Sequence, residues 1–318
     1  MISEGEMIIM KKIGFVVPCY NEVDNVGELY QQISTIMREM KRYEYEFIFI
    51  DNASTDGTKT VLRSLAKKDK KVKAIFNTRN FGQIRSPFYA LLQCHADAVI
   101  RIAADLQDPP ELIPEFIEKW ESGLKVVMGV KVVSEESPII YGLRSFYYKT
   151  LQSLAEITLV EHATGFGLYD QEVVKELRMI NDPYPFFRGL IAEMGYKYEA
   201  IPYKQPKRKR GLTKNNFYTL YDMAMLGLTN HSKLPLRIAT MLGFLTSVIS
   251  FLVGLVYLVY KLVNWQNFAL GLAPVVVGLF FMGSIQLLFL GIVGEYIGAI
   301  YTQVLNRPLV VEDERLNF

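Results

Sequence analysis

Two long apolar stretches near the end of the chain contrast with the alternating pattern that precedes them. Residues 238–260 and 268–290 contain no Asp, Glu, Lys or Arg. At about 1.5 Å rise per residue, each is long enough to cross a hydrocarbon core roughly 30 Å thick. The pattern predicts a hairpin of two membrane helices. The alternative is a buried helical hairpin in a soluble protein, but core helices of this length normally keep a polar face.

The first two-thirds of the chain alternate between short apolar runs and segments with apolar residues at helical spacing. The short runs predict strands at 13–18, 47–50, 72–76, 98–102 and 126–130. The spaced segments predict helices at 25–40, 56–65, 81–92 and 109–120. Strands that alternate with helices indicate a mostly parallel, doubly wound α/β sheet.

Polar residues follow each of the first four predicted strands. They occupy positions 20–22, 51–52, 79–80 and 105–108. Ligands of such sheets bind beyond the carboxyl ends of the strands, so these positions are expected to form one site. Neither GxGxxG after the first strand nor GxxxxGK[ST] occurs, which argues against a dinucleotide site and a P-loop.

Charge and cysteine content exclude several classes of protein. The net charge of +2 gives no indication of nucleic-acid binding. Cys19 and Cys94 are too few for a disulfide framework and are expected to be buried free thiols. Residues 1–12 lack the long apolar core of a secretory signal, which predicts a soluble part in the cytoplasm.

The charges that flank the two apolar stretches predict their orientation. Arg237 precedes the first stretch, Arg307 follows the second, and Lys261 is the single charge between them. Basic residues favour the cytoplasmic side, so both ends of the hairpin are predicted inside, with a short loop outside near Trp265.

Four motifs occur in register with the predicted strand ends: Val-Pro-Cys-Tyr-Asn-Glu at 17–22, Ile-Asp-Asn-Ala-Ser-Thr-Asp-Gly at 50–57, Arg-Asn-Phe-Gly at 79–82 and Ala-Asp-Leu-Gln-Asp-Pro-Pro-Glu at 104–111. Together they resemble the inverting family 2 nucleotide-sugar glycosyltransferases with a GT-A fold. With the hairpin, the chain is similar to the polyprenyl-phosphate glycosyltransferases, which include dolichol-phosphate mannose synthase and bacterial undecaprenyl-phosphate glucosyltransferases with two membrane helices.

This resemblance implies four regions. They are a cytoplasmic GT-A domain at 1–214, an amphipathic juxtamembrane segment at 215–236, two transmembrane helices at 237–302 and a cytoplasmic tail at 303–318. It also implies a set of residues that bind the nucleotide sugar: Pro18, Tyr20, Glu22, Asp51, Asn80 and Gln107. For Asp51 and Asp56 the alternative is turn and helix-capping chemistry, which residues 51–57 would provide on their own.

Asp105 occupies the position of the family's Asp-x-Asp motif, which implies a catalytic role and a Mg²⁺ or Mn²⁺ ligand. The first Asp of that motif is Ala103 here, so a metal would depend on Asp105, with Gln107 or Asp108 nearby. The alternative is an N-cap of the helix at 109–120, a role that suits Asp108 better than Asp105.

Basic residues are expected to meet the phosphates of the two substrates. Arg208 and Lys214, in the basic loop at 204–214, match a loop that lies near the active site in the family. A solvated face or a contact with anionic lipids is the alternative for such a run. Arg188 is the second catalytic candidate, for the lipid phosphate or the diphosphate.

The acceptor side departs from the family pattern. Many relatives carry Asp in a Gly-Asp-Phe-Arg-Leu segment, where this chain has Gly165. A lipid phosphate is already largely anionic at neutral pH, so a strong general base is less necessary, and none is assigned. Asp170 lies nearby, but helix capping explains it more simply.

These residues together predict inverting transfer of one sugar to undecaprenyl phosphate at the cytoplasmic membrane face, with UDP-glucose as the preferred donor. UDP-N-acetylglucosamine or another donor is the alternative. A processive polysaccharide synthase lacks support because no Gln-x-x-Arg-Trp motif occurs. Ala103 and Gly165 stand where the family has Asp, so a non-catalytic sugar-nucleotide-binding protein stays an alternative.

The membrane helices contain small residues that permit close helix packing, so a homo-oligomer is expected. These residues are Gly278, Gly283, Gly291 and Gly294.

Overall fold

An eight-stranded mixed sheet forms the centre of the domain that precedes the hairpin. The computed structural model describes residues 10–133, 160, 163–206, 225–226, 229, 232, 234–263 and 272–318. The strand order across the sheet is β7-β5-β6-β4-β1-β2-β3-β8. The strands are β1 (Lys11–Cys19), β2 (Tyr43–Asp51), β3 (Val72–Asn77), β4 (Ala98–Arg101), β5 (Val126–Val133), β6 (Ala163–Asp170), β7 (Tyr198–Lys204) and β8 (Glu312–Leu316).

Most neighbouring strands are parallel, as predicted, but two strands run the other way. β4, β1, β2 and β3 form a parallel block, with Cys19 of β1 opposite Asp51 of β2. β6 lies antiparallel between β4 and β5, and β8 is antiparallel to β3. The parallel block brings four carboxyl ends to one edge, where the polar motifs follow.

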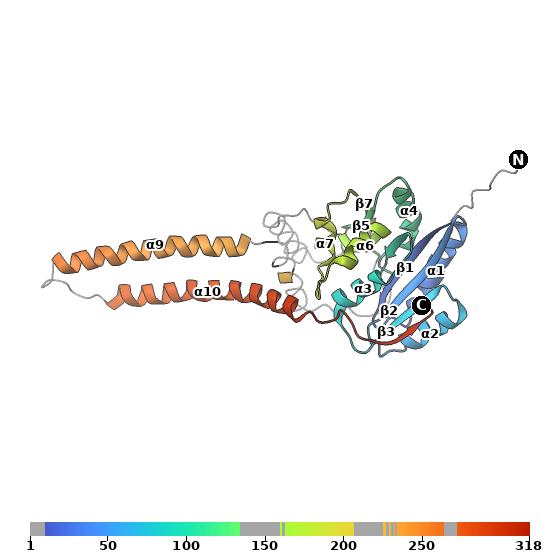
Figure 1. The fold of residues 1–318 in the computed structure, drawn as a ribbon, viewed down its shortest axis with the longest axis horizontal. Helices are drawn as coiled ribbons and strands as arrows, with labels where there is room; N and C mark the ends of the chain where they lie inside the picture. Colours follow the sequence, from blue (N-terminus) through green and yellow to red (C-terminus); the bar gives the residue numbers. More distant parts are fainter. Residues whose placement is uncertain are drawn as a thin grey trace.

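Helices cover both faces of the sheet (Figure 1). α1 (Val26–Glu39), α2 (Thr58–Lys68) and α4 (Ile113–Glu121) pack on one face. α3 (Gly82–Leu92), α6 (Gln171–Met179) and α7 (Phe187–Glu193) pack on the other, and the short 3₁₀ helix η1 (Pro110–Leu112) leads into α4. Alternate β1 side chains serve both cores, since Phe15 and Val17 join one cluster and Val16 the other. Cys19 and Cys94 are buried free thiols, as expected.

The hairpin consists of α9 (Leu234–Val263) and α10 (Leu272–Leu305), which extend together away from the domain (Figure 1). By length and composition both are able to cross a membrane, with mean hydropathies of 2.1 and 1.6 over Leu234–Val256 and Gly278–Leu305. Only 6% and 0% of these windows are buried, which does not fit the alternative of a buried hairpin in a soluble protein. α10 continues to Leu305, past the predicted end at 290.

The chain after α10 returns to the domain and adds β8 to the edge of the sheet (Figure 1). The Thr78 N–H donates to the Val311 carbonyl at 3.0 Å. An ion pair joins Arg63 and Glu314 at 2.6 Å, and the Asn317 amide donates to the carbonyls of Ala66 and Val72 at 2.7 and 2.8 Å. The tail expected at 303–318 thus contains the last turn of α10 and an edge strand that the charged sequence did not predict.

Candidate active site

A cleft of about 730 Å³ lies at the carboxyl ends of β1, β2, β3 and β4. Seven predicted site residues line it: Pro18, Tyr20, Glu22, Asn80, Asp105, Gln107 and Arg188. Asp51 lies behind this surface, fully buried at the end of β2. Arg208 and Lys214 lie outside the described residues. The topological prediction that the strand-end motifs converge is therefore confirmed.

Three residues other than glycine adopt left-handed backbone conformations in the loops at the strand ends. Asn21, Ala53 and Leu106 have φ values of 56°, 61° and 60°. Such conformations cost of order 1–3 kcal/mol in residues with a Cβ, and they concentrate at functional sites. Each loop therefore holds an unfavourable backbone geometry that the surrounding hydrogen bonds must maintain.

Asp51 has one carboxylate oxygen satisfied and one without a partner. Its Oδ2 accepts a hydrogen bond from the Ser54 N–H at 3.0 Å. Its Oδ1 is buried and has no hydrogen-bond partner within the described part of the chain. Burial raises the pKa of Asp51, against the lowering effect of the hydrogen bonds from Ser54. A donor supplied by a ligand would satisfy this oxygen.

Asp56, the second acid of this motif, has a structural role. Its Oδ1 accepts from the Thr58 N–H and hydroxyl at 3.0 and 2.6 Å, and its Oδ2 accepts from the Val23 N–H at 3.1 Å. Although burial raises the pKa of Asp56, these hydrogen bonds hold it below the ordinary value. The alternative of turn and capping chemistry therefore accounts for Asp56.

Asn52, which the sequence analysis placed at a strand end without giving it a role, connects the ends of β2 and β3. Its Nδ2 donates to Asn80 Oδ1 at 2.8 Å and to the Gly82 carbonyl at 3.1 Å. Its Oδ1 accepts from Asn77 Nδ2 at 3.1 Å and from the Phe81 N–H at 2.8 Å. The network orients Asn80 at the cleft surface. Asn77, a polar residue at the end of an otherwise apolar strand, was the sequence signal that could have identified this network.

The loop after β4 presents Asp105 to the cleft. Its Oδ1 accepts from the Gln107 N–H at 3.2 Å, across the left-handed Leu106. Its Oδ2 makes no hydrogen bond to any residue in the described ranges. The Gln107 Nε2 donates to the Pro206 carbonyl at 3.3 Å, which ties this loop to the end of β7. Residue 206 belongs to the basic loop at 204–214, so the described beginning of that loop lies next to Gln107 at the cleft.

Asp108 supports the loop from behind and does not cap the helix. Its Oδ2 accepts from the Ala103 N–H at 3.1 Å, and its Oδ1 accepts from the Tyr203 hydroxyl at 3.0 Å. η1 has no side-chain N-cap, so the capping alternative for Asp108 was wrong. Asp170, by contrast, does cap α6, where it accepts from the Glu172 N–H at 2.8 Å.

The buried Asp108 predicts a pH dependence of stability. Burial raises its pKa to about 6, from an ordinary value of 3.8. The folded protein therefore holds this proton more tightly than the unfolded chain, and wild-type stability relative to Asp108→Asn should rise as pH falls from about 6 to about 4. The pKa difference corresponds to roughly 3 kcal/mol.

Melting temperatures of both proteins at several pH values would check this expectation. Asparagine keeps an oxygen for the Ala103 N–H and offers an amide to the Tyr203 hydroxyl, so the variant should fold. A difference in melting temperature that stays constant between pH 4.5 and 7.5 would show that Asp108 does not titrate in this range.

Two arginines lie on the α7 side of the cleft. Arg188 donates from Nη1 to the Ala163 carbonyl at 3.0 Å and lies 5.3 Å from the Phe186 ring. The Arg101 guanidinium lies 5.1 Å from the Phe187 ring. Sequence analysis missed Arg101, although a charged residue within an otherwise apolar strand was a usable signal.

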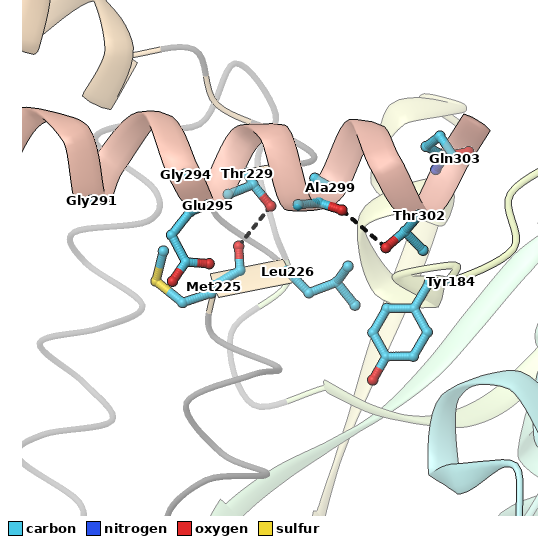
Figure 2. A pocket seen from close by; sticks show the side chains of 11 residues that line it. Tyr184, Met225, Leu226, Thr229, Gly291, Gly294, Glu295, Ala299, Thr302 and Gln303 are labelled. Carbon is cyan, nitrogen blue, oxygen red and sulfur yellow. Dashed lines mark hydrogen bonds between the residues drawn. The ribbon is translucent and has the colours of Figure 1, made fainter. Parts of the chain in front are cut away.

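A second hollow, a groove of about 530 Å³, lies where the hairpin meets the domain (Figure 2). Gly291, Gly294 and Gly298 of α10 form one wall, and Met225 and Leu226 face them. Tyr184 also lines the groove, while the residues that follow it, 185–188, line the cleft. The groove and the cleft are therefore neighbours through one short segment.

Polar contacts join α10 both to the domain and to the chain just before α9. The Gln303 Nε2 on α10 donates to Asp182 Oδ1 at 2.8 Å. The Tyr296 hydroxyl donates to the Ser232 carbonyl at 2.5 Å. The Gln303–Asp182 hydrogen bond holds the domain-side end of α10 beside the segment that leads to Arg188, and the Tyr296–Ser232 hydrogen bond joins α10 to the chain just before α9.

The chain was compared with known families and proteins. Residues 15–178 match the family described as Glycosyl transferase family 2, and residues 234–300 match the GtrB C-terminal hairpin. The SfII prophage-derived bactoprenol glucosyl transferase of Shigella flexneri is 34% identical over 298 residues, which cover 93% of this chain and 96% of that protein. The bactoprenol glucosyl transferase of Shigella phage SfV is 33% identical over 306 residues, covering 96% and 99%.

Among solved structures, glucosyl-3-phosphoglycerate synthase from Mycobacterium tuberculosis, in complex with Mn²⁺, uridine diphosphate and phosphoglyceric acid, superposes with a TM-score of 0.47 at 15% identity. The superposition covers 69% of this chain and 76% of that one. The family matches carry more weight than this distant likeness, and they agree with the motifs in the cleft. The chain therefore belongs to glycosyl transferase family 2, carries a GtrB C-terminal hairpin, and is a glycosyltransferase.

Proposed function

We propose that this glycosyltransferase moves one glucose from UDP-glucose to undecaprenyl phosphate at the cytoplasmic face of the membrane. The observation that carries the proposal is the adjacency of the Asp105 cleft and the groove at the foot of the hairpin. A lipid headgroup that follows α10 out of the bilayer would reach the cleft over the segment 184–188. Two relatives that match over nearly their full length are bactoprenol glucosyl transferases, which supports the general activity and this acceptor; the choice of glucose is the part that the donor panel below tests.

The nucleoside of the donor is expected at the ends of β1 and β2. There, Asp51 Oδ1 has no partner within the described ranges, and Glu22 borders the cleft. A carboxylate oxygen is an acceptor, which suits a base N–H or a ribose hydroxyl. Tyr20 and Pro18 offer an apolar surface to the same ligand. The diphosphate would then extend toward Asp105.

The donor set of the cleft fits a divalent cation that the substrate helps to bind. In the described ranges no group of three or more His, Cys, Asp or Glu residues could hold a metal ion. Both Asp108 oxygens are already bonded, which leaves Asp105 as the carboxylate of this loop. One carboxylate with diphosphate oxygens and water is a common arrangement for Mg²⁺. When bound, Mg²⁺ or Mn²⁺ would offset the negative charge on the leaving diphosphate.

The chemistry needs no general base from the protein. A phosphate oxygen of the acceptor attacks the anomeric carbon from the side opposite UDP. The bond from that carbon to the UDP oxygen breaks, its electron pair leaves with UDP, and the configuration inverts. Because the attacking phosphate is already anionic at neutral pH, Gly165 is compatible with activity. The protein contributes by holding both substrates in line.

Both ends of the hairpin are proposed to lie in the cytoplasm. The chain enters the hairpin after β7 and returns as β8 of the same sheet, so both ends belong on one side of the membrane. Arg237 and Arg307 at these ends favour the cytoplasmic side. The expected homo-oligomer stays a prediction.

Radiolabel transfer tests the proposed function. Purified protein in detergent with Mg²⁺ would be offered labelled UDP-glucose, UDP-N-acetylglucosamine and other donors, with undecaprenyl phosphate as acceptor. We expect label in the organic phase with UDP-glucose and none when undecaprenol replaces the phosphate. Transfer from another donor alone would reassign the sugar. No transfer from any donor, with UDP binding intact, would contradict the proposed acceptor.

A further inference from the structure

Arg101 places a guanidinium in the middle of the sheet, at a position where apolar side chains are usual. It is the last residue of β4, opposite Val16 on one side and Gly167 on the other. Residues 98–100 before it are all fully buried. Arg101 itself is part-buried and borders the cleft. A charged side chain here costs desolvation energy and therefore calls for an explanation.

The surroundings of Arg101 offer little that would neutralise its charge. Within the described ranges, no carboxylate forms an ion pair with Arg101, and no acceptor takes a hydrogen bond from it. Asp108 attracts Arg101 at longer range, but both of its oxygens are occupied. Arg188 adds a second positive charge nearby, and burial lowers the pKa of Arg101. Since arginine stays protonated in proteins, the site holds a positive charge that Asp108 offsets only at longer range and that no carboxylate in the described ranges pairs with directly.

Two neighbouring positions explain why the guanidinium fits and stays unpaired. A Cβ added at Gly165 would lie 2.7 Å from Arg101 Nη1, so any side chain there would displace it. Gly165 also has a φ of 88°, which disfavours other residues. Ala103, two residues further along, carries no carboxylate either. Gly165 and Ala103 thus stand at the positions where the related motifs have Asp, and the Arg101 guanidinium fills the space next to Gly165.

The position of Arg101 within the cleft indicates which anion it serves. Phe187, whose ring contacts the guanidinium, belongs to the segment that connects the cleft to the α10 groove. Glu22 and Asp51, where the nucleoside is expected, lie at the ends of β1 and β2. These are the first and second strands beyond β4 in the order of the sheet. An anion that arrives from the groove therefore meets Arg101 and Arg188 before it meets the nucleoside end.

We propose that Arg101 binds the phosphate of the isoprenoid acceptor, together with Arg188, and holds it next to the sugar. The inference rests on the proposed function, because it takes the acceptor to be a lipid phosphate. A charge-assisted contact of this kind both orients the phosphate and satisfies the buried guanidinium. It also accounts for the Gly165 departure, since an Asp there would neutralise or displace the cation.

Calorimetric binding of farnesyl phosphate and of UDP to the full-length protein tests the proposal. We expect Arg101→Gln to weaken farnesyl phosphate about tenfold, the size of one lost charge-assisted hydrogen bond, and to leave UDP within about twofold. The affinity of Arg101→Lys for farnesyl phosphate should fall between those of wild type and Arg101→Gln, because lysine keeps the charge but lacks the paired N–H donors of the guanidinium. Gly165→Asp should weaken farnesyl phosphate as Arg101→Gln does.

Arg42→Gln serves as the matched control. Arg42 is exposed and pairs with Glu121 at 2.9 Å. The Arg42→Gln variant therefore removes the same charge as Arg101→Gln, but on the outside of the domain. Intact UDP binding reports that each variant has folded. Weaker UDP binding with unchanged farnesyl phosphate binding would assign Arg101 to the donor and overturn the proposal. Unchanged affinity of Arg101→Gln for both ligands would also overturn the proposal. The same holds if inorganic phosphate displaces farnesyl phosphate from the wild-type protein at equal concentration.

The binding assay and the transfer assay fail independently. Farnesyl phosphate binding that depends on Arg101, in a protein that transfers no sugar to undecaprenyl phosphate, would contradict the proposed reaction alone. Normal transfer with a wild-type KM for undecaprenyl phosphate in Arg101→Gln would contradict the role of Arg101 alone.

Discussion

Replacing Asp105 with Asn is expected to lower turnover by at least about a hundredfold, the loss typical of removing one group that stabilises charge in the transition state. Asp105 is the carboxylate that the β4 loop presents to the cleft, since Asp108 is occupied and Ala103 has none. An amide would keep the hydrogen bond from the Gln107 N–H but lose the charge that attracts a divalent cation. The loop should therefore keep its shape while the chemistry is lost.

Two measurements separate this effect from a structural one. Radiolabel transfer gives the turnover, and the affinity for UDP with and without Mg²⁺ reports on the cation. We expect Mg²⁺ to strengthen UDP binding in wild type and to have no effect in Asp105→Asn. The matched control is Asp313→Asn, an exposed Asp in β8 outside the cleft. Wild-type turnover in Asp105→Asn, or an unchanged response to Mg²⁺, would refute the role of Asp105.

Removing residues 311–318 is expected to lower the stability of the catalytic domain by about 3 kcal/mol. The truncation deletes the strand pairing with β3, the Arg63–Glu314 ion pair and the two hydrogen bonds from Asn317. Each hydrogen bond contributes roughly 0.5–1.5 kcal/mol, and Leu316 also packs against the core. The melting temperature should fall by roughly 6–12 °C for a domain of this size.

Truncation also uncovers the edge of β3, which is an expected site of aggregation. Light scattering on heating would detect it. A chain in which residues 311–318 are replaced by a Gly/Ser segment of equal length is the control for chain length, and it should behave like the truncation. Asn317→Ala should show a smaller loss. Equal melting temperatures for the wild-type and truncated proteins would mean that β8 contributes nothing to stability.

Much of the fold could be predicted because apolar spacing is strong in the first 130 residues. The runs that became β1 to β5 are short, apolar and rich in branched residues, and each is followed by turn chemistry. β6 gave a weaker signal because Gly165 and Gly167 interrupt it. Gly167 is required there, since an added Cβ would lie 2.4 Å from the Val127 carbonyl oxygen. β8, with the sequence Glu-Asp-Glu-Arg-Leu, has no alternating apolar pattern at all.

The site was predictable to the extent that motifs mark strand ends. Asp105, Glu22 and Arg188 line one cleft because the topology brings their strands and helices together, while their roles stay predictions. The motifs did not reveal which other residues hold the cleft residues in place. Asn52 acts through four hydrogen bonds that depend on the positions of β2 and β3. Arg101 was hidden within a strand prediction, because its importance comes from the space left by Gly165 on another strand.

β7 and β8 are the two opposite edges of the sheet, and the hairpin lies between them in the chain. A domain attached to the bilayer by a single linker could swing away from the surface, and its encounters with a lipid would depend on linker length. Attachment at both edges restricts that swing and keeps the cleft near one height above the membrane. If the acceptor is the proposed lipid phosphate, the search for it takes place in two dimensions, so the rate should follow the surface density of the lipid rather than its bulk concentration.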